Sequence, residues 1–177
     1  MKRICRVALV GECMIELRGR IFGTMQQAFG GDTLNTAVYL SRLAGHKGVE
    51  VSYAMGSEFS EADEDEKAKA LALAAKSDVI VAVVGGSSSR FGGAVFDANG
   101  AASKGTGSRS MDCGEGMDTA KVHIPAAQEE LIAALARLGK PLVTVVIAGR
   151  AYCIEKIENA SDAVLYAFYP GPMGGKA

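Results

Sequence analysis

Residues 78–84 read DVIVAVV and residues 142–148 read LVTVVIA, and these two apolar runs decide the fold of the chain. Both are short and rich in β-branched residues, and neither alternates with polar residues as a half-exposed strand does. Such runs are typical of strands that are buried on both faces of a parallel sheet. We therefore expect both to lie inside a parallel sheet that helices cover.

Three further strand-like runs accompany this pair, at residues 4–10, 49–54 and 163–169. Helical patterns separate the five runs, at residues 32–44, 61–75, 125–138 and 152–160. Strands that alternate with helices predict a mainly parallel sheet with right-handed crossovers. The expected fold is therefore α/β, a doubly wound, flavodoxin-like three-layer sandwich, formed as a single domain by residues 1–177.

The second helical pattern carries its own start signal. Residues 60–63 read Ser-Glu-Ala-Asp, which resembles a capping box with Ser60 as the N-cap. The apolar residues that follow at helical spacing, and that we expect to face the sheet, are Ala68, Leu71, Ala72 and Ala75.

The stretch from Gly85 to Ile124 is rich in glycine and serine and has no clear period. A loop of this length in a compact domain is usually either functional or disordered, and the sequence leaves both readings open. Doubly wound sheets bind ligands beyond the carboxyl ends of their strands, at the switch in strand order. We therefore expect any ligand near Gly31, Gly86 and this long loop.

Composition excludes several classes of partner. Nineteen Lys and Arg residues stand against 20 Asp and Glu residues, so no basic surplus is available for nucleic acid. The four cysteines form no C-x-x-C pair and the two histidines are far apart, which argues against a zinc site and for reduced thiols. No run approaches the ~18 apolar residues of a membrane span, and the first apolar run is too short for a signal peptide. We expect a cytoplasmic chain without metal or cofactor and without a nucleic-acid or membrane partner.

Residues 7–17 (VALVGECMIEL) and 29–45 (FGGDTLNTAVYLSRLAG) resemble the N-terminus of 2-keto-3-deoxygluconate kinases, which belong to the ribokinase-like sugar kinases. In that family this segment helps to hold the hydroxyls of the sugar acid. The resemblance therefore implies that Gly31, Asp32 and Asn35 contact a substrate. The alternative is that Asp32 caps the helix that follows and that Asn35 lies in its first turn.

A second set of strings resembles the C-terminal α/β domain of glycoside hydrolase family 3, the β-glucosidases and β-xylosidases. The strings are GVEVSYAMG (48–56), SDVIVAVVGGSSSR (77–90), MDCGEGMD (111–118), QEELIAALARLGKPLVTVVIAGR (128–150) and SDAVLYAFYPGPMGG (161–175). We accordingly divide the chain into a sugar-kinase-like segment, residues 1–45, and a family-3-like segment, residues 46–177.

The second resemblance implies a site on the long loop. In family 3 the nucleophilic aspartate lies on a separate barrel domain, and the loop of the α/β domain supplies the acid/base glutamate. The matching residue here is Glu115, within GEGMD, although Thr119 stands where the family usually has arginine. Retaining glycosidases need two carboxylates about 5–5.5 Å apart, so Glu115 without a barrel is expected to be a vestigial, solvated acid/base.

Two arginines follow strand ends and are further candidates. Arg90 follows the run at 78–84 and Arg150 follows the run at 142–148. Either can contact an anion or a sugar, and we include Arg90 with the substrate-binding residues. The alternative is that such arginines pair with local carboxylates or lie in solvent.

Together the resemblances predict an engineered or recombined scaffold without a complete catalytic site. The sequence contains neither the barrel of the glycosidases nor the Gly-Ala-Gly-Asp segment that the sugar kinases use for nucleotide and base. Two alternatives stay open. One is a family 3 fragment that needs a barrel domain for activity, and the other is a sugar-binding module. Family 3 domains continue into a helix where this chain has Ala177, so we also expect a homodimer through the sheet face that this helix would cover.

Overall fold

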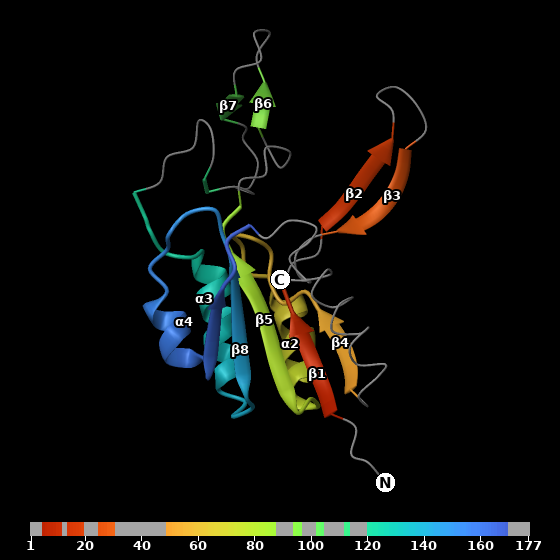
Figure 1. The fold of residues 1–177 in the computed structure, drawn as a ribbon, viewed down its shortest axis with the longest axis vertical. Helices are drawn as coiled ribbons and strands as arrows, with labels where there is room; N and C mark the ends of the chain where they lie inside the picture. The colour runs from red at the N-terminus through yellow and green to blue at the C-terminus, as the bar shows by residue number, and fades with distance from the viewer. Residues whose placement is uncertain are drawn as a thin grey trace.

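A computed structural model of the chain describes residues 5–11, 14–19, 25–30, 49–87, 94–96, 102–104, 112–113 and 120–169. Its centre is a parallel sheet of five strands in the order β4-β1-β5-β8-β9 (Figure 1). The five strands are β1 (Cys5–Val10), β4 (Val49–Ala54), β5 (Val79–Gly85), β8 (Leu142–Ile147) and β9 (Ala163–Tyr166). The strand order turns back once, between β1 and β5, as in a flavodoxin-like sheet. The predicted α/β fold with a doubly wound parallel sheet is confirmed.

Strand β5 extends beyond the stretch that pairs with β1. This pairing ends where Val10 faces Ala82, whereas the pairing of β5 with β8 continues until Ile147 faces Gly85. The last three residues of β5 therefore extend beyond the end of β1 and have a strand partner on one side only.

Three helices cover one face of the sheet (Figure 1). They are α2 (Glu64–Ala75), α3 (Ala126–Ala136) and α4 (Glu155–Ala160). The main core lies between these helices and the strands. Its largest fully buried aliphatic side chains are Val10, Ile80, Ile124, Leu131, Ile132, Leu135, Leu142, Val146 and Ile157. Each such side chain stabilises the fold by about 1.5–3 kcal/mol relative to an exposed one.

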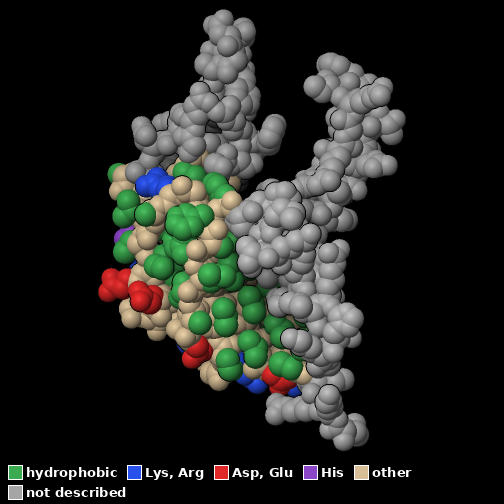
Figure 2. Space-filling view, viewed as in Figure 1, with side chains coloured by type: hydrophobic (Ala, Val, Ile, Leu, Met, Phe, Trp, Pro, Cys, Tyr) green, Lys and Arg blue, Asp and Glu red, His purple; other side chains and the backbone are tan. Residues whose placement is uncertain are grey.

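The opposite face of the sheet is apolar as well. Leu9, Val83 and Ile147 are buried there, and half-buried apolar side chains of the neighbouring strands pack around them. Figure 2 shows hydrophobic side chains spread over this face of the sheet. Two apolar faces are what a sheet inside a three-layer sandwich requires. The helix that we predict at residues 32–44 for the third layer lies outside the described residues.

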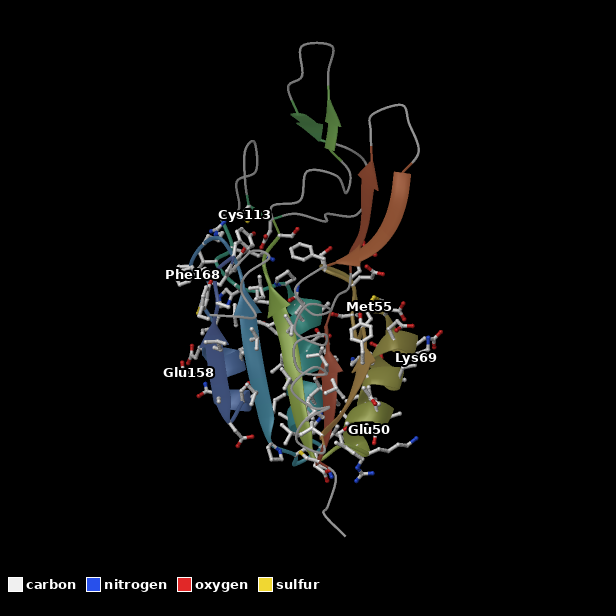
Figure 3. All side chains as sticks on the ribbon, turned by 45° about the vertical axis from the view of Figure 1, so that its right-hand side comes forward. Glu50, Met55, Lys69, Cys113, Glu158 and Phe168 are labelled. Atoms are coloured by element: carbon white, nitrogen blue, oxygen red, sulfur yellow. The ribbon has the colours of Figure 1, made fainter. Side chains whose placement is uncertain are left out.

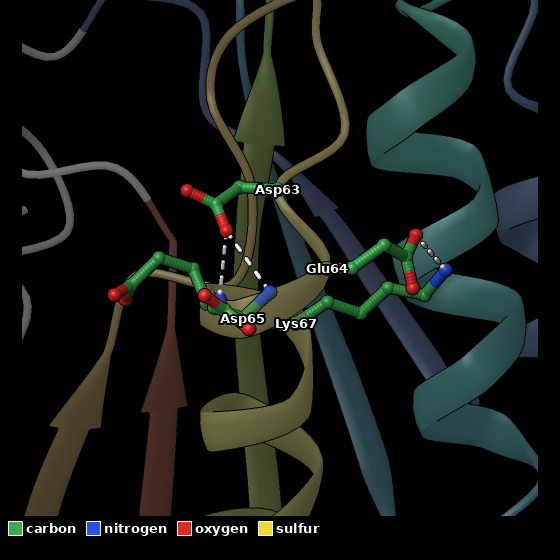
Figure 4. A network of polar contacts seen from close by, with 5 residues as sticks. Asp63, Glu64, Asp65 and Lys67 are labelled. Atoms are coloured by element: carbon green, nitrogen blue, oxygen red, sulfur yellow. Dashed lines mark hydrogen bonds and ion pairs between the residues drawn. The ribbon is translucent and has the colours of Figure 1, made fainter.

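Helix α2 begins three residues later than predicted. Its N-cap is Asp63, whose Oδ1 accepts the backbone N–H groups of Asp65 and Glu66, each at 3.0 Å (Figure 4). The prediction that Ser60 caps this helix is wrong, because the carboxylate of Asp63 satisfies two of the free N–H groups of the first turn. Such a cap contributes about 0.5–2 kcal/mol.

The predicted inner face of α2 is also wrong. Ala70 and Ala74 are its buried residues, whereas Ala68, Ala72 and Ala75 are exposed and Leu71 is half-buried. Apolar residues lie on every side of this helix, so their spacing does not single out one face.

The last two elements are shorter than predicted. Helix α4 begins at Glu155 instead of residue 152, because the backbone N–H of Cys153 donates to the carbonyl of Val122 at 2.6 Å. Strand β9 ends at Tyr166, before Phe168 takes a positive φ of 54°.

Two antiparallel hairpins were not predicted. One pairs β2 (Met14–Gly19) with β3 (Met25–Gly30), and the other pairs β6 (Ala94–Phe96) with β7 (Ala102–Lys104). Both lie beyond the carboxyl ends of the sheet strands (Figure 1), and the second belongs to the long loop. Within the described part of the chain, no helix is long and apolar enough to cross a membrane.

Candidate functional site

Four segments meet at the carboxyl edge of the sheet, where β5, β8 and β9 end. Figure 3 shows Cys113 and Phe168 toward this edge and Glu50 near the opposite one. We name the residues gathered here the carboxyl-edge cluster, and they are Gly85, Gly86, Ser87, Asp112, Cys113, Arg150, Tyr152 and Tyr169.

Ser87 holds the long loop against the end of β5. Its backbone N–H donates to Oδ1 of Asp112 at 3.0 Å. Its carbonyl accepts the backbone N–H of Asp112 at 3.0 Å and that of Cys113 at 3.3 Å. These three bonds fasten two loop residues to a rigid strand end, although 24 residues separate Ser87 from Asp112 along the chain.

Tyr152 completes the anchor from the segment after β8. Its phenol donates a 2.6 Å hydrogen bond to Oδ2 of Asp112. Burial raises the pKa of the Tyr152 phenol, and the hydrogen bond to Asp112 and the charge of that carboxylate raise it further. Tyr152 therefore stays protonated and remains a donor at neutral pH. Both oxygens of Asp112 accept hydrogen bonds, so this carboxylate joins the end of β5 to the segment after β8.

Two glycines let aromatic rings lie directly on the backbone of this edge. A Cβ at Gly86 would run into the phenol oxygen of Tyr152, and a Cβ at Gly149 would run into the ring of Tyr169. The guanidinium of Arg150 lies 5.4 Å from the centroid of the Tyr152 ring, a cation–π distance. The cluster therefore combines aromatic rings with one cation beside a loop anchor.

The end of β9 contacts the same loop. The phenol of Tyr169 lies 3.6 Å from Sγ of Cys113. The neighbouring Phe168 packs its ring 5.1 Å from that of Tyr166, whose phenol donates to the carbonyl of Arg150. Burial raises the pKa of Tyr166, so this donor also stays protonated.

Gln128, the third residue of α3, is buried and makes hydrogen bonds to Gly85 of the cluster. Its Oε1 accepts the N–H of Gly85 at 2.7 Å, and its Nε2 donates to the carbonyls of Phe59 at 2.8 Å and Gly85 at 3.1 Å. The side-chain amide thus contacts the end of β5 on the side where β1 has already ended.

The five residues that we predict for the site all lie outside the described residues, and they are Gly31, Asp32, Asn35, Arg90 and Glu115. Their roles stay predictions. The structure brings Gly86 and Arg150, which were considered from the sequence, together with Asp112 of the family-3-like string 111–118.

Sequence reasoning missed Ser87, Tyr152 and Gln128. Gln128 has no distinctive local signal, because Glu129 and Glu130 follow it directly in the first turns of the same helix. No local pattern pairs Ser87 or Tyr152 with Asp112, since that pairing depends on how the sheet brings distant segments together. Among the described residues, no group of three or more His, Cys, Asp or Glu side chains could hold a metal ion.

The model of the glycosyl hydrolase family 3 C-terminal domain matches residues 2–177. A β-xylosidase from Formosa agariphila is 29% identical over 129 residues, which are 73% of this chain and 15% of that protein. A solved β-glucosidase from Listeria innocua, in complex with isofagomine, covers 98% of this chain with a TM-score of 0.63 and 23% identity. The chain covers 20% of that structure.

The N-terminal part has a second set of relatives. A 2-dehydro-3-deoxygluconokinase from Haemophilus influenzae is 54% identical over 48 residues, which are 27% of this chain and 15% of the kinase. The chain therefore spans a fifth or less of each of these relatives. Both predicted resemblances are confirmed.

Proposed function

This chain belongs to the glycosyl hydrolase family 3 C-terminal domain family, and on that premise we propose that it supplies the acid/base loop of a retaining β-glycosidase. Glu115 is the acid/base in this proposal. A separate barrel domain supplies the nucleophile, so the chain alone turns over no glycoside. The named relatives support β-linked glucose or xylose as the sugar of the substrate.

The anchoring of Asp112 and Cys113 carries this proposal. Glu115 follows Cys113 by two residues, and consecutive Cα atoms are about 3.8 Å apart, so the Cα atoms of Cys113 and Glu115 are at most about 7.6 Å apart. Because Asp112 and Cys113 are hydrogen-bonded to Ser87 at the carboxyl edge, we assign Glu115 to the same edge in this proposal. This edge is where doubly wound sheets bind their ligands.

The division of labour follows from the chemistry. One carboxylate attacks the anomeric carbon, and the other protonates the leaving oxygen and later activates water. The acid/base must be held within hydrogen-bond reach of that oxygen. The Ser87–Asp112–Tyr152 bonds anchor the chain three residues before Glu115, so in this proposal the anchor does not use the carboxylate that transfers the proton.

Complementation tests the proposal. The chain is mixed with the barrel domain of a family 3 β-glucosidase from which the α/β domain has been removed, and release of an aryl alcohol from an aryl β-glycoside is followed. We expect turnover from the mixture and from neither part alone. When the aryl alcohol is a poor leaving group such as unsubstituted phenol, Glu115→Gln should lower turnover by about 10²–10⁴-fold. Glu130→Gln, the same change at an exposed position of α3, should leave turnover unchanged. If the chain and the barrel domain bind each other but the mixture releases no aryl alcohol, the proposal is contradicted.

We propose, second, that the chain is a recombined, engineered product of two enzymes. The observation that favours this origin is the contrast between 54% identity to a sugar kinase over 48 residues and 29% identity to a β-xylosidase over 129 residues. An experimental structure tests it: residues 4–45 should superimpose on a sugar kinase and the remainder on a family 3 domain. Residues 4–45 that follow neither parent would contradict it.

The kinase match also supports a binding function without catalysis. In this alternative, Gly31, Asp32, Asn35 and Arg90 hold a sugar acid. A ligand that binds only the native state must raise the melting temperature. A rise with 2-keto-3-deoxygluconate that Asp32→Ala removes would support the alternative, and no rise at millimolar ligand would contradict it.

A further inference from the structure

We propose that Gln128 is a positioning residue for the carboxyl-edge cluster, and that its amide sets the strand end from which Ser87 holds Asp112. The part of this inference that concerns Glu115 rests on the proposed function. The part that concerns Asp112 rests on the contacts of the described residues alone.

The inference begins from the register of the sheet. Beyond Ala82, β5 has no partner in β1, whereas β8 still pairs with it as far as Gly85. The N–H of Gly86 donates to the carbonyl of Ile147 at 3.1 Å and therefore points toward β8. Successive residues of a strand point their backbone N–H and C=O groups to opposite sides. The N–H and C=O of Gly85 therefore face the side where β1 is missing.

The amide of Gln128 replaces the missing strand at this point. It accepts from the N–H of Gly85 and donates to the C=O of the same residue, at 2.7 and 3.1 Å. Both backbone groups of Gly85 are thereby satisfied where an unpaired buried group would cost free energy.

Only one orientation of the amide fits this environment. Nε2 faces two carbonyls, those of Gly85 and Phe59, and Oε1 faces one N–H. A rotated amide would place its oxygen against both carbonyls and its nitrogen against the N–H. The bond to Phe59 also ties the segment between β4 and α2 to the same edge, so three segments are fixed relative to one another.

The position of Gly85 in turn determines where Ser87 holds the loop. Gly85 is held by Gln128 on one side and Gly86 by Ile147 on the other, and Ser87 follows directly. Ser87 makes three backbone hydrogen bonds that involve Asp112 and Cys113. Movement of Gly85 would therefore move the group that holds the loop.

Backbone amide exchange on the 177-residue chain tests the inference. Gln128→Met keeps the length of the side chain and removes all three hydrogen bonds. We expect the N–H groups of Gly85, Ser87, Asp112 and Cys113 to exchange faster by roughly tenfold or more, the equivalent of one lost hydrogen bond. Leu135→Ala is the control, because Leu135 is fully buried in the same helix and has no part in these bonds.

The two variants separate positioning from plain loss of stability. A general loss of stability accelerates the slowest core amides, whereas loss of positioning accelerates the four edge amides beyond the change in the core. Leu135→Ala should show only the first pattern. If Gln128→Met accelerates Gly85 but leaves Asp112 and Cys113 unchanged, the inference is overturned.

Gln128→Glu provides an independent check if Gln128→Met fails to fold. Ionised, the new carboxylate faces two carbonyls, so its folded-state pKa must lie above its unfolded value of about 4.3. Because the carboxylate of Asp112 also titrates in the acid range, each measurement is compared with the parent chain at the same pH. Relative to the parent, the edge amides of Gln128→Glu should keep their protection below about pH 4.3 and lose it as the pH rises. Protection at Asp112 and Cys113 that does not change with pH would contradict the inference.

These tests remain separate from the test of the proposed function. Amide exchange needs neither a barrel domain nor turnover. An expected exchange pattern together with failed complementation would reject the catalytic role of Glu115 and leave Gln128 as the residue that positions the Asp112 anchor.

Discussion

The phenol of Tyr152 and the carboxylate of Asp112, which are 40 residues apart in sequence, are joined by a 2.6 Å hydrogen bond. This bond links the segment after β8 to the long loop that follows β5. Asp112 is also bound by the backbone of Ser87, so one carboxylate connects two strand ends to one loop. Loss of either partner of Asp112 should therefore loosen the loop at this edge.

Tyr152→Phe should release the loop while retaining the ring. Hydrogen bonds to charged groups contribute about 1.5–3 kcal/mol, so we expect the free energy of unfolding to fall by roughly that amount. Denaturation in urea measures the loss, and amide exchange at Asp112 and Cys113 shows where it acts. Tyr166→Phe removes a phenol bond to the carbonyl of Arg150 and is the control. Equal exchange at Asp112 in both variants would argue against the anchor.

Gly86→Ala should break the same connection from the backbone side. The added methyl group would meet the phenol oxygen of Tyr152, so the ring must move away from Asp112. Gly139→Ala is a suitable comparison, because a Cβ there meets nothing within 4 Å and only the positive φ of 64° opposes it. That strain alone costs about 1–2 kcal/mol. Thermal melts should show a larger loss for Gly86→Ala, and a smaller loss would count against the close packing at this glycine.

The buried carboxylate of Glu129 on α3 pairs with Lys156, and this pair should make the fold less stable at alkaline pH. Lys156 donates to Oε2 of Glu129 at 2.7 Å, and the side chain of Glu129 is only 7% exposed. The hydrogen bond and the charge of Glu129 raise the pKa of Lys156 above its usual value of 10.5. The contribution of this pair is therefore fully present below pH 10.5 and is lost as the pH rises through the higher pKa of the folded state.

Lys156→Met tests this pair by thermal melts across pH. We expect a lower melting temperature than the parent at pH 7 and a difference that shrinks as the parent loses its charge at high pH. Lys67→Met is the matched control, because Lys67 pairs with Glu64, whose side chain is 76% exposed. Equal losses for the two variants at pH 7 would show that the burial of Glu129 does not matter.

The edge strand β9 is the basis for a prediction about assembly. Leu165 on this strand is 58% exposed and Phe168 just after it is 63% exposed. Exposed apolar residues on an edge strand favour pairing with another copy. We propose a homodimer through the exposed sheet face on which Leu165 lies beside Val145. Size-exclusion chromatography with light scattering should give twice the chain mass, and Leu165→Lys should give the monomer. A monomeric parent at all concentrations would refute the proposal.

The sequence predicted the central sheet well because its strands carry a strong and unambiguous signal. The runs at 78–84 and 142–148 correspond to β5 and β8, two of the three inner strands of the five-stranded sheet. The inner face of α2 was mispredicted because its apolar residues lie on all sides, so close packing of Ala70 and Ala74 decides the face. Helical spacing contains no information about that packing.

The carboxyl-edge cluster could be predicted only in part. The resemblance to family 3 directed attention to the loop that contains Asp112 and Glu115. The partners of Asp112 could not be found in the same way, because Ser87 and Tyr152 meet it through the order and register of the strands. Gln128 depends on the point at which β1 ends, which is a property of the whole sheet.

The most direct test of the central claim compares two leaving groups in the complemented enzyme. A general acid matters most when the leaving oxygen is strongly basic, and its contribution is typically about 10²–10⁴-fold. We predict that Glu115→Gln lowers kcat/KM by this amount for an alkyl β-glycoside and only slightly for a dinitrophenyl β-glycoside, whose leaving group needs no proton. Equal losses for both substrates, or no loss for either, would contradict the assignment of Glu115 as the acid of a shared glycosidase site.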